Sequence, residues 1–149
     1  MDKWDKAIEA IRKSDKKSSV YVGCDSIRFK KDGKWRARYS TVIILHRASR
    51  NGANLFYDTV TLDDYGNLKL RLMNEVMFAL DVATAVVDHL DGRTLEIHVD
   101  INPDNRHASN VAVKEALGYI RGSGFIAKIK PEAFAATHAS DHVARGKLH

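Results

Sequence analysis

The sequence has a single cysteine, Cys24, among its 149 residues. One thiol cannot close a disulfide within the chain, and it cannot supply the cysteine set of a structural zinc site. This composition excludes a disulfide-stabilised scaffold and is compatible with a reducing compartment, so we expect a cytoplasmic protein. We expect Cys24 to be a small buried apolar side chain rather than a nucleophile, because no oriented histidine partner is evident.

Long apolar runs are also missing. No stretch approaches the roughly 20 apolar residues that span a bilayer, and the opening stretch MDKWDKAIEAIRKSDKK lacks the apolar segment of a secretory signal. We therefore expect no membrane partner. The 44% share of hydrophobic residues and the chain length predict one ordinary domain with a single core over residues 1–149.

Acidic residues are outnumbered by basic ones, 19 against 24, which gives a formal net charge of +5 and a pI near 9.3. This excess permits an anionic partner such as nucleic acid. It is equally compatible with simple solubility, so charge alone leaves both interpretations open.

The hydrophobic pattern predicts four helices and five strands. The predicted helices cover residues 2–13, 68–90, 109–121 and 131–145. The predicted strands cover residues 19–27, 35–46, 55–62, 95–102 and 125–130. Asp32-Gly33 and Asn51-Gly52 are hairpin signals, so the first three strands form an antiparallel meander. Two further strands, each preceded by a helix, predict an α/β fold with a mixed sheet covered by helices.

Four carboxylates interrupt the apolar pattern of these elements: Asp25, Glu75, Asp100 and Asp141. Asp25 and Asp100 stand near the ends of two strands that are plausible parallel neighbours. Glu75 is the lone acid in the first three turns of the long helix, and Asp141 lies on the last helix. Because the carboxyl ends of parallel strands meet at one edge of a sheet, all four could gather there.

Converging carboxylates repel one another unless cations lie between them. Hard oxygen ligands suit Mg²⁺ or Mn²⁺, and two such ions about 4 Å apart activate water and stabilise the leaving oxygen in phosphodiester cleavage. Each acid also has a structural interpretation without metal. Asp25 and Asp100 could be turn residues, while Glu75 and Asp141 could be solvated helix acids beside an arginine four residues away.

Five polar residues near these acids are candidates to orient a ligand or contact a substrate: Ser26, His98, Asn102, Lys130 and His138. His98 shares a strand face with Glu96 and Asp100, so it could orient a ligand or move a proton, or be a satisfied histidine under a helix. Lys130 could face phosphates or protect an edge strand. A proton-transfer role for His138 is a further hypothesis.

Basic residues concentrate in the first predicted hairpin: Arg28, Lys30, Lys31, Lys34, Arg36 and Arg38. They surround Trp35 and Tyr39. A basic hairpin with aromatic residues can hold a nucleic-acid backbone. A solvated hairpin that aids solubility is the alternative.

Six stretches, which together cover most of the chain, carry a family resemblance: VGCDS (22–26), NGANLFY (51–57), RLMNEV (71–76), IHVDIN (97–102), GYIRGSGF (118–125) and KIKPEAFAATHASDHVA (128–144). With the order of elements, they resemble the ribonuclease H-like superfamily. More narrowly, the chain is similar to the YkuK-type ribonuclease H-like proteins of bacteria and phages.

The resemblance implies a mixed five-stranded sheet whose first three strands are antiparallel. It also implies hydrolysis of nucleic-acid phosphodiester bonds at a two-metal carboxylate site, with two Mg²⁺ or Mn²⁺ ions. By position, Asp25 would be the bridging acid, Glu75 the helix acid, Asp100 the second strand acid and Asp141 the last-helix acid.

Two other functions stay open on the same fold. One is a module that binds nucleic acid or protein without catalysis, because one fold hosts many functions. The other is a junction-resolving endonuclease, which usually acts as a dimer. A homodimer is therefore a possible state of the chain, and the sequence leaves RNA, DNA and hybrid substrates equally open.

Overall fold

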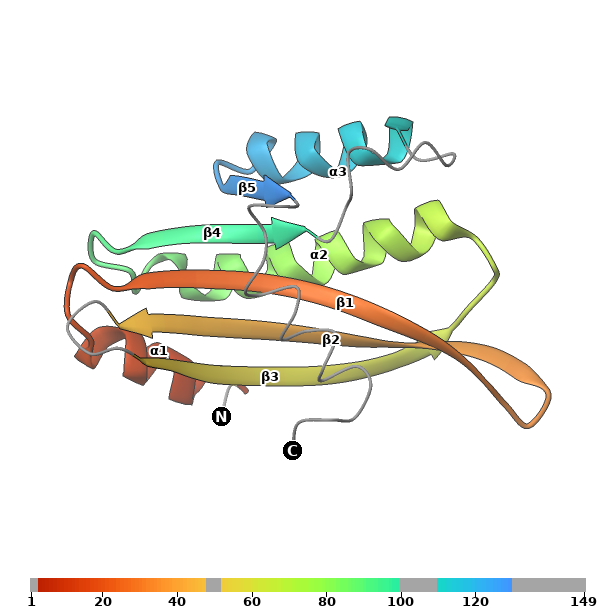
Figure 1. Ribbon diagram of the computed structural model, residues 1–149, viewed down its shortest axis with the longest axis horizontal. Coiled ribbons are helices and arrows are strands. Elements are labelled where there is room, and N and C mark those ends of the chain that lie inside the picture. The colour runs from red at the N-terminus through yellow and green to blue at the C-terminus, as the bar shows by residue number, and fades with distance from the viewer. Residues whose placement is uncertain (1–2, 48–51, 100–109, 130–149) are drawn as a thin grey trace.

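The computed structural model describes residues 3–47, 52–99 and 110–129 (Figure 1). The elements are α1 (Asp5–Lys13), β1 (Ser19–Lys31), β2 (Lys34–Arg47), β3 (Gly52–Asp63), α2 (Leu68–Val87), β4 (Thr94–Val99), α3 (Asn110–Gly122) and β5 (Ile126–Ile129). Within the described residues the strands form a five-stranded sheet in the order β3-β2-β1-β4-β5. The first three strands are antiparallel and β4 and β5 run parallel to β1, so the predicted mixed sheet is confirmed.

The β1–β2 hairpin is longer than predicted. Lys31 pairs with Lys34, and Asp32 and Gly33 between them have φ values of 52° and 78°. This is the two-residue turn that Asp-Gly favours, and its twist matches that of the strands it joins. Strand pairing therefore continues to the turn on both sides. The second predicted hairpin turn has Asn51 outside the described residues.

Two predicted helices begin or end elsewhere. The first begins at Asp5 rather than residue 2. The helix predicted over 68–90 ends at Val87, because the backbone amides of His89 and Leu90 donate to carbonyls three residues back, in a tighter turn. At its start, the side chain of Asn67 accepts a hydrogen bond from the amide of Leu70. The predicted helix over 131–145 lies outside the described residues, and the structure describes β4 only to Val99.

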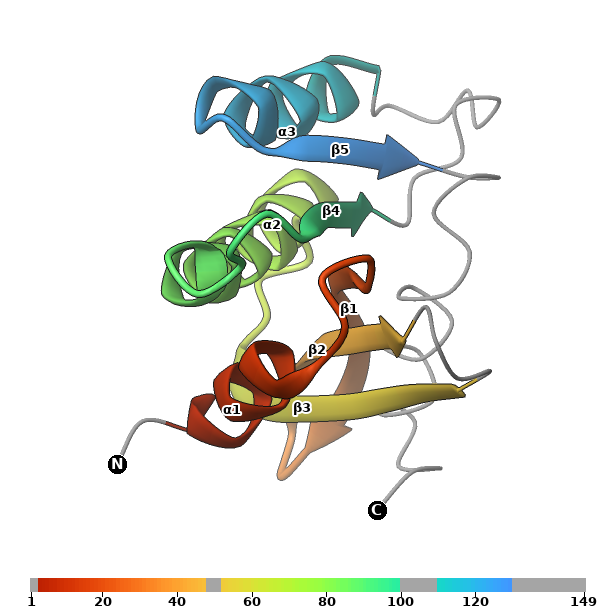
Figure 2. The ribbon, with the colours of Figure 1, turned by 90° about the vertical axis from the view of Figure 1, so that its left-hand side faces the viewer.

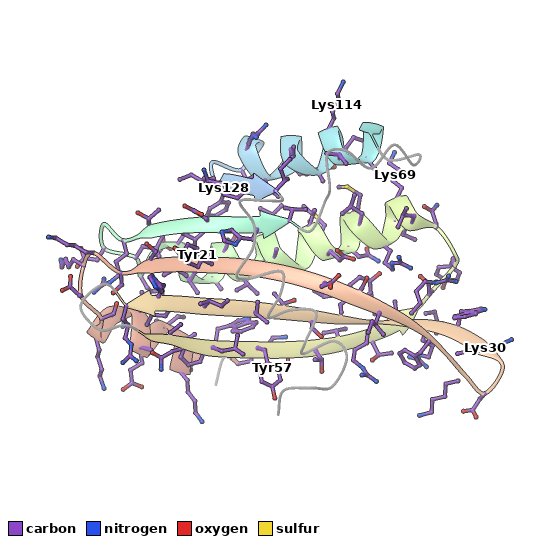
Figure 3. The ribbon with its side chains drawn as sticks, viewed as in Figure 1. Tyr21, Lys30, Tyr57, Lys69, Lys114 and Lys128 are labelled. Atoms are coloured by element: carbon purple, nitrogen blue, oxygen red, sulfur yellow. The ribbon has the colours of Figure 1, made fainter. Side chains whose placement is uncertain are left out.

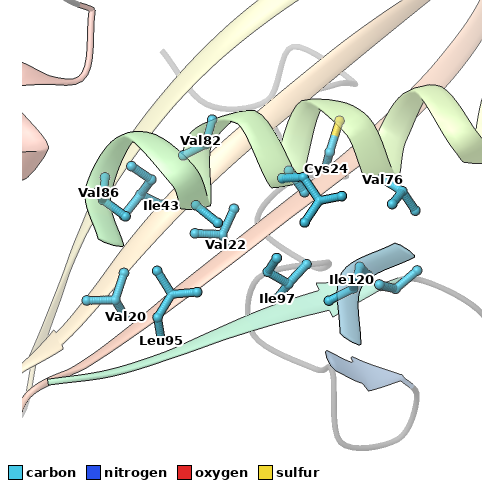
Figure 4. Packing of buried hydrophobic residues seen from close by; sticks show 14 of the residues in the cluster. Val20, Val22, Cys24, Ile43, Val76, Val82, Val86, Leu95, Ile97 and Ile120 are labelled. Carbon is cyan, nitrogen blue, oxygen red and sulfur yellow. The ribbon is translucent and has the colours of Figure 1, made fainter. Parts of the chain in front are cut away.

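All three described helices cover one face of the sheet, as Figure 2 shows. Alternate residues of β1 point to this face, and α2 presents apolar residues at spacings of three and four. Figure 4 shows the resulting core, which includes Val20, Val22, Ile43, Val76, Val82, Val86, Leu95, Ile97 and Ile120. Burial of one such side chain contributes about 1.5–3 kcal/mol. No described helix is both long and apolar enough to cross a bilayer.

The opposite face of the sheet carries a second, smaller apolar cluster. It contains Val42 and Ile44, which are buried, with Tyr21 packed against them. Because strand residues alternate between faces, Asp25 belongs to the face of Tyr21, whereas Ser26 belongs to the helical face. The end of β1 therefore places neighbouring polar residues on opposite sides of the sheet.

Cys24 lies in the core on the helical face, with 4% of its surface exposed. Burial raises the pKa of its thiol well above the ordinary value of 9.0, and the negative charges of Glu75 and Asp25 raise it further. A hydrogen bond from Thr41 Oγ1 to the sulfur, 3.5 Å long, acts in the opposite direction. The prediction of a buried, apolar cysteine is confirmed.

Arg93 joins the end of α1 to the turn before β4. The side chain is 6% exposed, and its Nε donates to Ser14 Oγ at 2.9 Å. Its other nitrogens donate to the carbonyl of Leu90 at 3.0 Å and to the carbonyls of Ser14 and Arg12. A buried cation thus satisfies carbonyls at the carboxyl end of a helix, where the helix dipole favours positive charge.

We expect Arg93→Ala to lower the free energy of unfolding by about 2–3 kcal/mol, because buried carbonyls lose a charged donor. Urea denaturation measures this change. Arg121→Ala, which removes an exposed arginine from α3, is the matched control and should change stability by no more than about 0.5 kcal/mol. Equal effects of the two substitutions would contradict the structural role of Arg93.

We expect the stability of the protein to fall as pH rises above about 9, where the thiol of an unfolded chain begins to ionise. A raised pKa in the folded state means that the folded state holds this proton more tightly, so its contribution is complete below pH 9 and is lost above it. The slope from this one proton is up to about 1.4 kcal/mol per pH unit. Denaturation of wild type and Cys24→Ala between pH 7 and pH 10 should show the slope in the wild type and a flatter profile in the variant. Parallel profiles would contradict the prediction.

Candidate functional site

Asp25 follows the part of β1 that pairs with β4. Within the described residues, this parallel pairing extends to Gly23 opposite His98, two residues before Asp25. The carboxylate is half-buried, and its Oδ1 accepts a hydrogen bond from the Ser26 amide at 2.8 Å. Asp25 therefore stands at the carboxyl end of a parallel strand pair, where open α/β sheets bind their ligands.

Glu75 reaches the same strand end from α2. The Ser26 hydroxyl donates a hydrogen bond to Glu75 Oε2 at 2.6 Å, which joins residues 49 positions apart in the sequence. A bond this short from a hydroxyl to a carboxylate is typical of charge-assisted hydrogen bonds, which are about twice as strong as neutral ones. Glu75 is half-buried and does not lie on an exposed helix stripe. Ser26 thus connects the two carboxylates, with Asp25 on one face of the strand and Glu75 on the helical face.

The electrostatics of Cys24 support this convergence. The charges of both Glu75 and Asp25 raise the pKa of the Cys24 thiol, so both carboxylates lie within electrostatic reach of one buried sulfur. Two carboxylates at one strand end are ligands of the kind that a hard divalent cation takes.

A contact that the sequence did not predict fixes α2 beside this strand end. Asn74 Nδ2 donates to the hydroxyl oxygen of Tyr39 at 3.0 Å, and Tyr39 is directly opposite Ser26 on β2. Burial raises the pKa of Tyr39, the Asn74 hydrogen bond lowers it, and the Glu75 charge raises it. The ring of Phe78 packs on Tyr39 with 5.2 Å between centroids. The hairpin register could have identified Tyr39, but no sequence signal marks Asn74.

His98 lies on the sheet face of Asp25. Its ring stacks on Tyr21 with centroids 4.8 Å apart, and its Nε2 lies 3.0 Å from Glu96 Oε1. The predicted sharing of a face with Glu96 is confirmed. The side chain is buried, and within the described residues its Nδ1 has no hydrogen-bond partner. The described helices cover the other face, and the helix predicted over 131–145 lies outside the described residues, so the alternative of a satisfied histidine beneath a helix stays a prediction.

The remaining predicted residues cannot be placed. Asp100, Asn102, Lys130, His138 and Asp141 lie outside the described residues, so their approach to Asp25 and Glu75 stays a prediction. Within residues 3–47, 52–99 and 110–129, no three histidine, cysteine, aspartate or glutamate side chains form a group that could hold a metal. Asp25 and Glu75 are the described half of the predicted four-carboxylate set.

Comparison with known proteins identifies the family and the fold. Residues 4–145 match the family described as Ribonuclease H-like. Among solved structures, the crystal structure of native prototype foamy virus protease-reverse transcriptase is similar in fold, with a TM-score of 0.50 and 10% sequence identity. The match covers 89% of this chain and 21% of the viral chain, so this chain spans about a fifth of the viral protein's length. No curated protein matches the chain.

The match to the family extends over nearly the whole chain, from the residue before α1 to a point well past β5. The sheet order, with three antiparallel strands followed by two parallel ones, agrees with the expectation drawn from the sequence. The narrower assignment to the YkuK-type group within the family stays a prediction. The chain belongs to the ribonuclease H-like family.

Proposed function

We propose that the protein is a divalent-metal-dependent nuclease that hydrolyses phosphodiester bonds of nucleic acid by a two-metal carboxylate mechanism. One contact carries the proposal, the 2.6 Å hydrogen bond between Ser26 and Glu75. It holds a helix carboxylate beside the strand end that carries Asp25. Membership of the ribonuclease H-like family supports the same assignment.

The described donors fit hard divalent cations. Asp25 and Glu75 offer carboxylate oxygens, which are the ligands that Mg²⁺ and Mn²⁺ prefer. The proposal adds Asp100, which follows β4 by one residue, and Asp141 as the remaining ligands. A bound pair of ions would supply an activated water and stabilise the leaving oxygen.

The residues of the chain would orient the ligands before a substrate arrives. The Ser26 amide holds one oxygen of Asp25, and the Ser26 hydroxyl holds one oxygen of Glu75. The hydrogen bond from Asn74 to Tyr39 fixes the turn of α2 that carries Glu75 against β2. Carboxylates fixed in this way need little reorganisation on binding a cation, which favours both affinity and catalysis.

We expect Mn²⁺ to raise the melting temperature of the wild type in a concentration-dependent way. The stabilisation is about 2.7 kcal/mol at a metal concentration 100 times Kd. Asp25→Asn should abolish most of this rise in melting temperature. It should also lower cleavage of RNA, DNA, hybrid or branched DNA by more than about 100-fold, because loss of a residue that only hydrogen-bonds to a metal ligand already costs about 10–100-fold. Asp81→Asn removes an exposed acid from the same helix as Glu75 and is the matched control.

The alternative functions predict other outcomes. A binding module without catalysis would hold nucleic acid, show no Mn²⁺-dependent melting shift and leave all four substrates intact, and this result would exclude the nuclease. A junction-resolving enzyme would prefer branched DNA and have the native mass of a dimer.

The control variant Asp81→Asn should behave as the wild type in every one of these measurements, because the Asp81 side chain is exposed to solvent.

We expect Ser26→Ala to weaken Mn²⁺ binding and lower kcat by about 10–100-fold, because both effects follow from loss of an oriented ligand. Ser26→Thr retains the hydroxyl and should recover most of both quantities. Thermal melting against Mn²⁺ concentration measures the affinity independently of activity. Wild-type affinity in Ser26→Ala would show that the hydroxyl does not position Glu75.

A further inference from the structure

The β1–β2 hairpin carries basic side chains on the same face as Asp25. Directly opposed residues of an antiparallel pair point to one face of the sheet. The pairs on the face of Asp25 are Asp25 with Ser40, Ile27 with Arg38, Phe29 with Arg36, and Lys31 with Lys34. We name Lys31, Lys34, Arg36 and Arg38 the basic face. It leads without interruption from the turn of the hairpin to the Asp25–Ser40 pair.

The opposite face of the hairpin is different, because one of its two bases, Arg28, is paired with a buried carboxylate. Arg28 Nε lies 2.5 Å from Asp64 Oδ2, whose side chain is 5% exposed. The guanidinium of Arg28 also lies 4.5 Å from the centre of the Trp35 ring. Lys30 is the other base on this side, at the end of the hairpin (Figure 3). An anionic ligand would therefore gain less from this face.

On the basic face, the ion pair of Arg36 is weaker. Arg36 Nε lies 3.9 Å from Asp63 Oδ1, too far for a hydrogen bond, and both side chains are partly exposed. Such an exposed ion pair contributes little to stability and would yield readily to a phosphate. Lys31 and Lys34 are exposed, and Arg38 lies over the Phe29 ring at 5.3 Å. The face thus offers positive charge with an aromatic ring among its bases.

The hairpin projects beyond the rest of the described sheet (Figure 1). Parallel pairing with β4 ends at Gly23, so in the described part of the chain no strand flanks β1 from Cys24 to Lys31 on that side. Lys31 is six residues from Asp25, which is about 20 Å along a strand. One nucleic-acid strand carries a phosphate about every 3.4 Å along its helix axis. The distance therefore corresponds to about six nucleotides.

We propose that the basic face binds the phosphate backbone of a nucleic-acid strand and leads that strand to Asp25. Full binding then requires a substrate that extends about six nucleotides beyond the cleaved bond on one side. The inference rests on the proposed nuclease function and adds to it the path and the minimum length of the substrate. It assigns the basic hairpin a role in binding, where the sequence alone left solubility equally open.

Binding without divalent metal tests the basic face separately from catalysis. We expect labelled oligonucleotides, measured by fluorescence anisotropy in EDTA, to bind the wild type with a strong salt dependence. Lys31→Gln/Lys34→Gln should weaken binding at low salt. It should also reduce the slope of log K against log salt by about 1.4 for a single strand or about 1.8 for a duplex.

A matched variant removes the same charge from other places. Lys30→Gln/Lys114→Gln takes one lysine from the opposite face of the hairpin and one exposed lysine from α3 (Figure 3). This control variant should keep the wild-type slope of log K against log salt. Oligonucleotides shorter than about six nucleotides should bind the wild type and Lys31→Gln/Lys34→Gln more nearly alike, and longer ones should separate the two proteins.

The outcomes distinguish this inference from the nuclease function. Equal loss of slope in the two double variants would show a general effect of net charge and overturn the basic face, as would a wild type that binds no oligonucleotide. A second outcome is salt-dependent binding that Lys31→Gln/Lys34→Gln weakens and the control variant does not, in a protein that cleaves none of the substrates. This result would support the role of the basic face and overturn the nuclease function. A third outcome is a wild type that cleaves nucleic acid, with Lys31→Gln/Lys34→Gln binding oligonucleotides as tightly as the wild type. This result would overturn the role of the basic face and leave the nuclease function standing.

Discussion

The alternation of side chains along β1 is the constraint on which the rest of the structure depends. β1 pairs with β2 on one side and with β4 on the other, so every side chain must point to one of two faces. Val22 and Cys24 point to the helices and build the core, and Ser26 follows on the same face to meet Glu75. Asp25, between the last two, points the other way. A shift of one residue in register would exchange the faces and bury the carboxylate in the core.

The strand changes its role along its length because its described neighbours pair with different parts of it. Within the described residues, β4 pairs with β1 as far as Gly23, whereas β2 accompanies β1 to Lys31. The first part of β1 is therefore central and apolar, the middle holds the carboxylate, and the last part is a hairpin rich in bases. Acids and bases thus follow one another along a single strand, an arrangement that suits a ligand of cations and phosphates together.

Hydrogen bonds across long sequence distances fix this arrangement. The Ser26–Glu75 bond attaches α2 to the polar end of β1, and the bonds of Arg93 attach α1 to the turn before β4. Both involve side chains that are costly to bury unless they are satisfied. The core supplies most of the stability through apolar area, while these polar contacts select how the helices sit on the sheet.

Local patterns determined much of this protein. Asp32-Gly33 specified the hairpin, and a long apolar stretch without glycine or proline specified α2. Acids within the apolar patterns of β1 and α2 marked Asp25 and Glu75 as candidate site residues. The tertiary structure alone decided that Ser26 joins those two acids, that Asn74 holds Tyr39, and that the basic face lies on the same side of the sheet as Asp25. A sequence pattern records the preferences of neighbouring residues. Contacts between distant residues depend on strand register and helix packing, which are fixed only when the whole core forms.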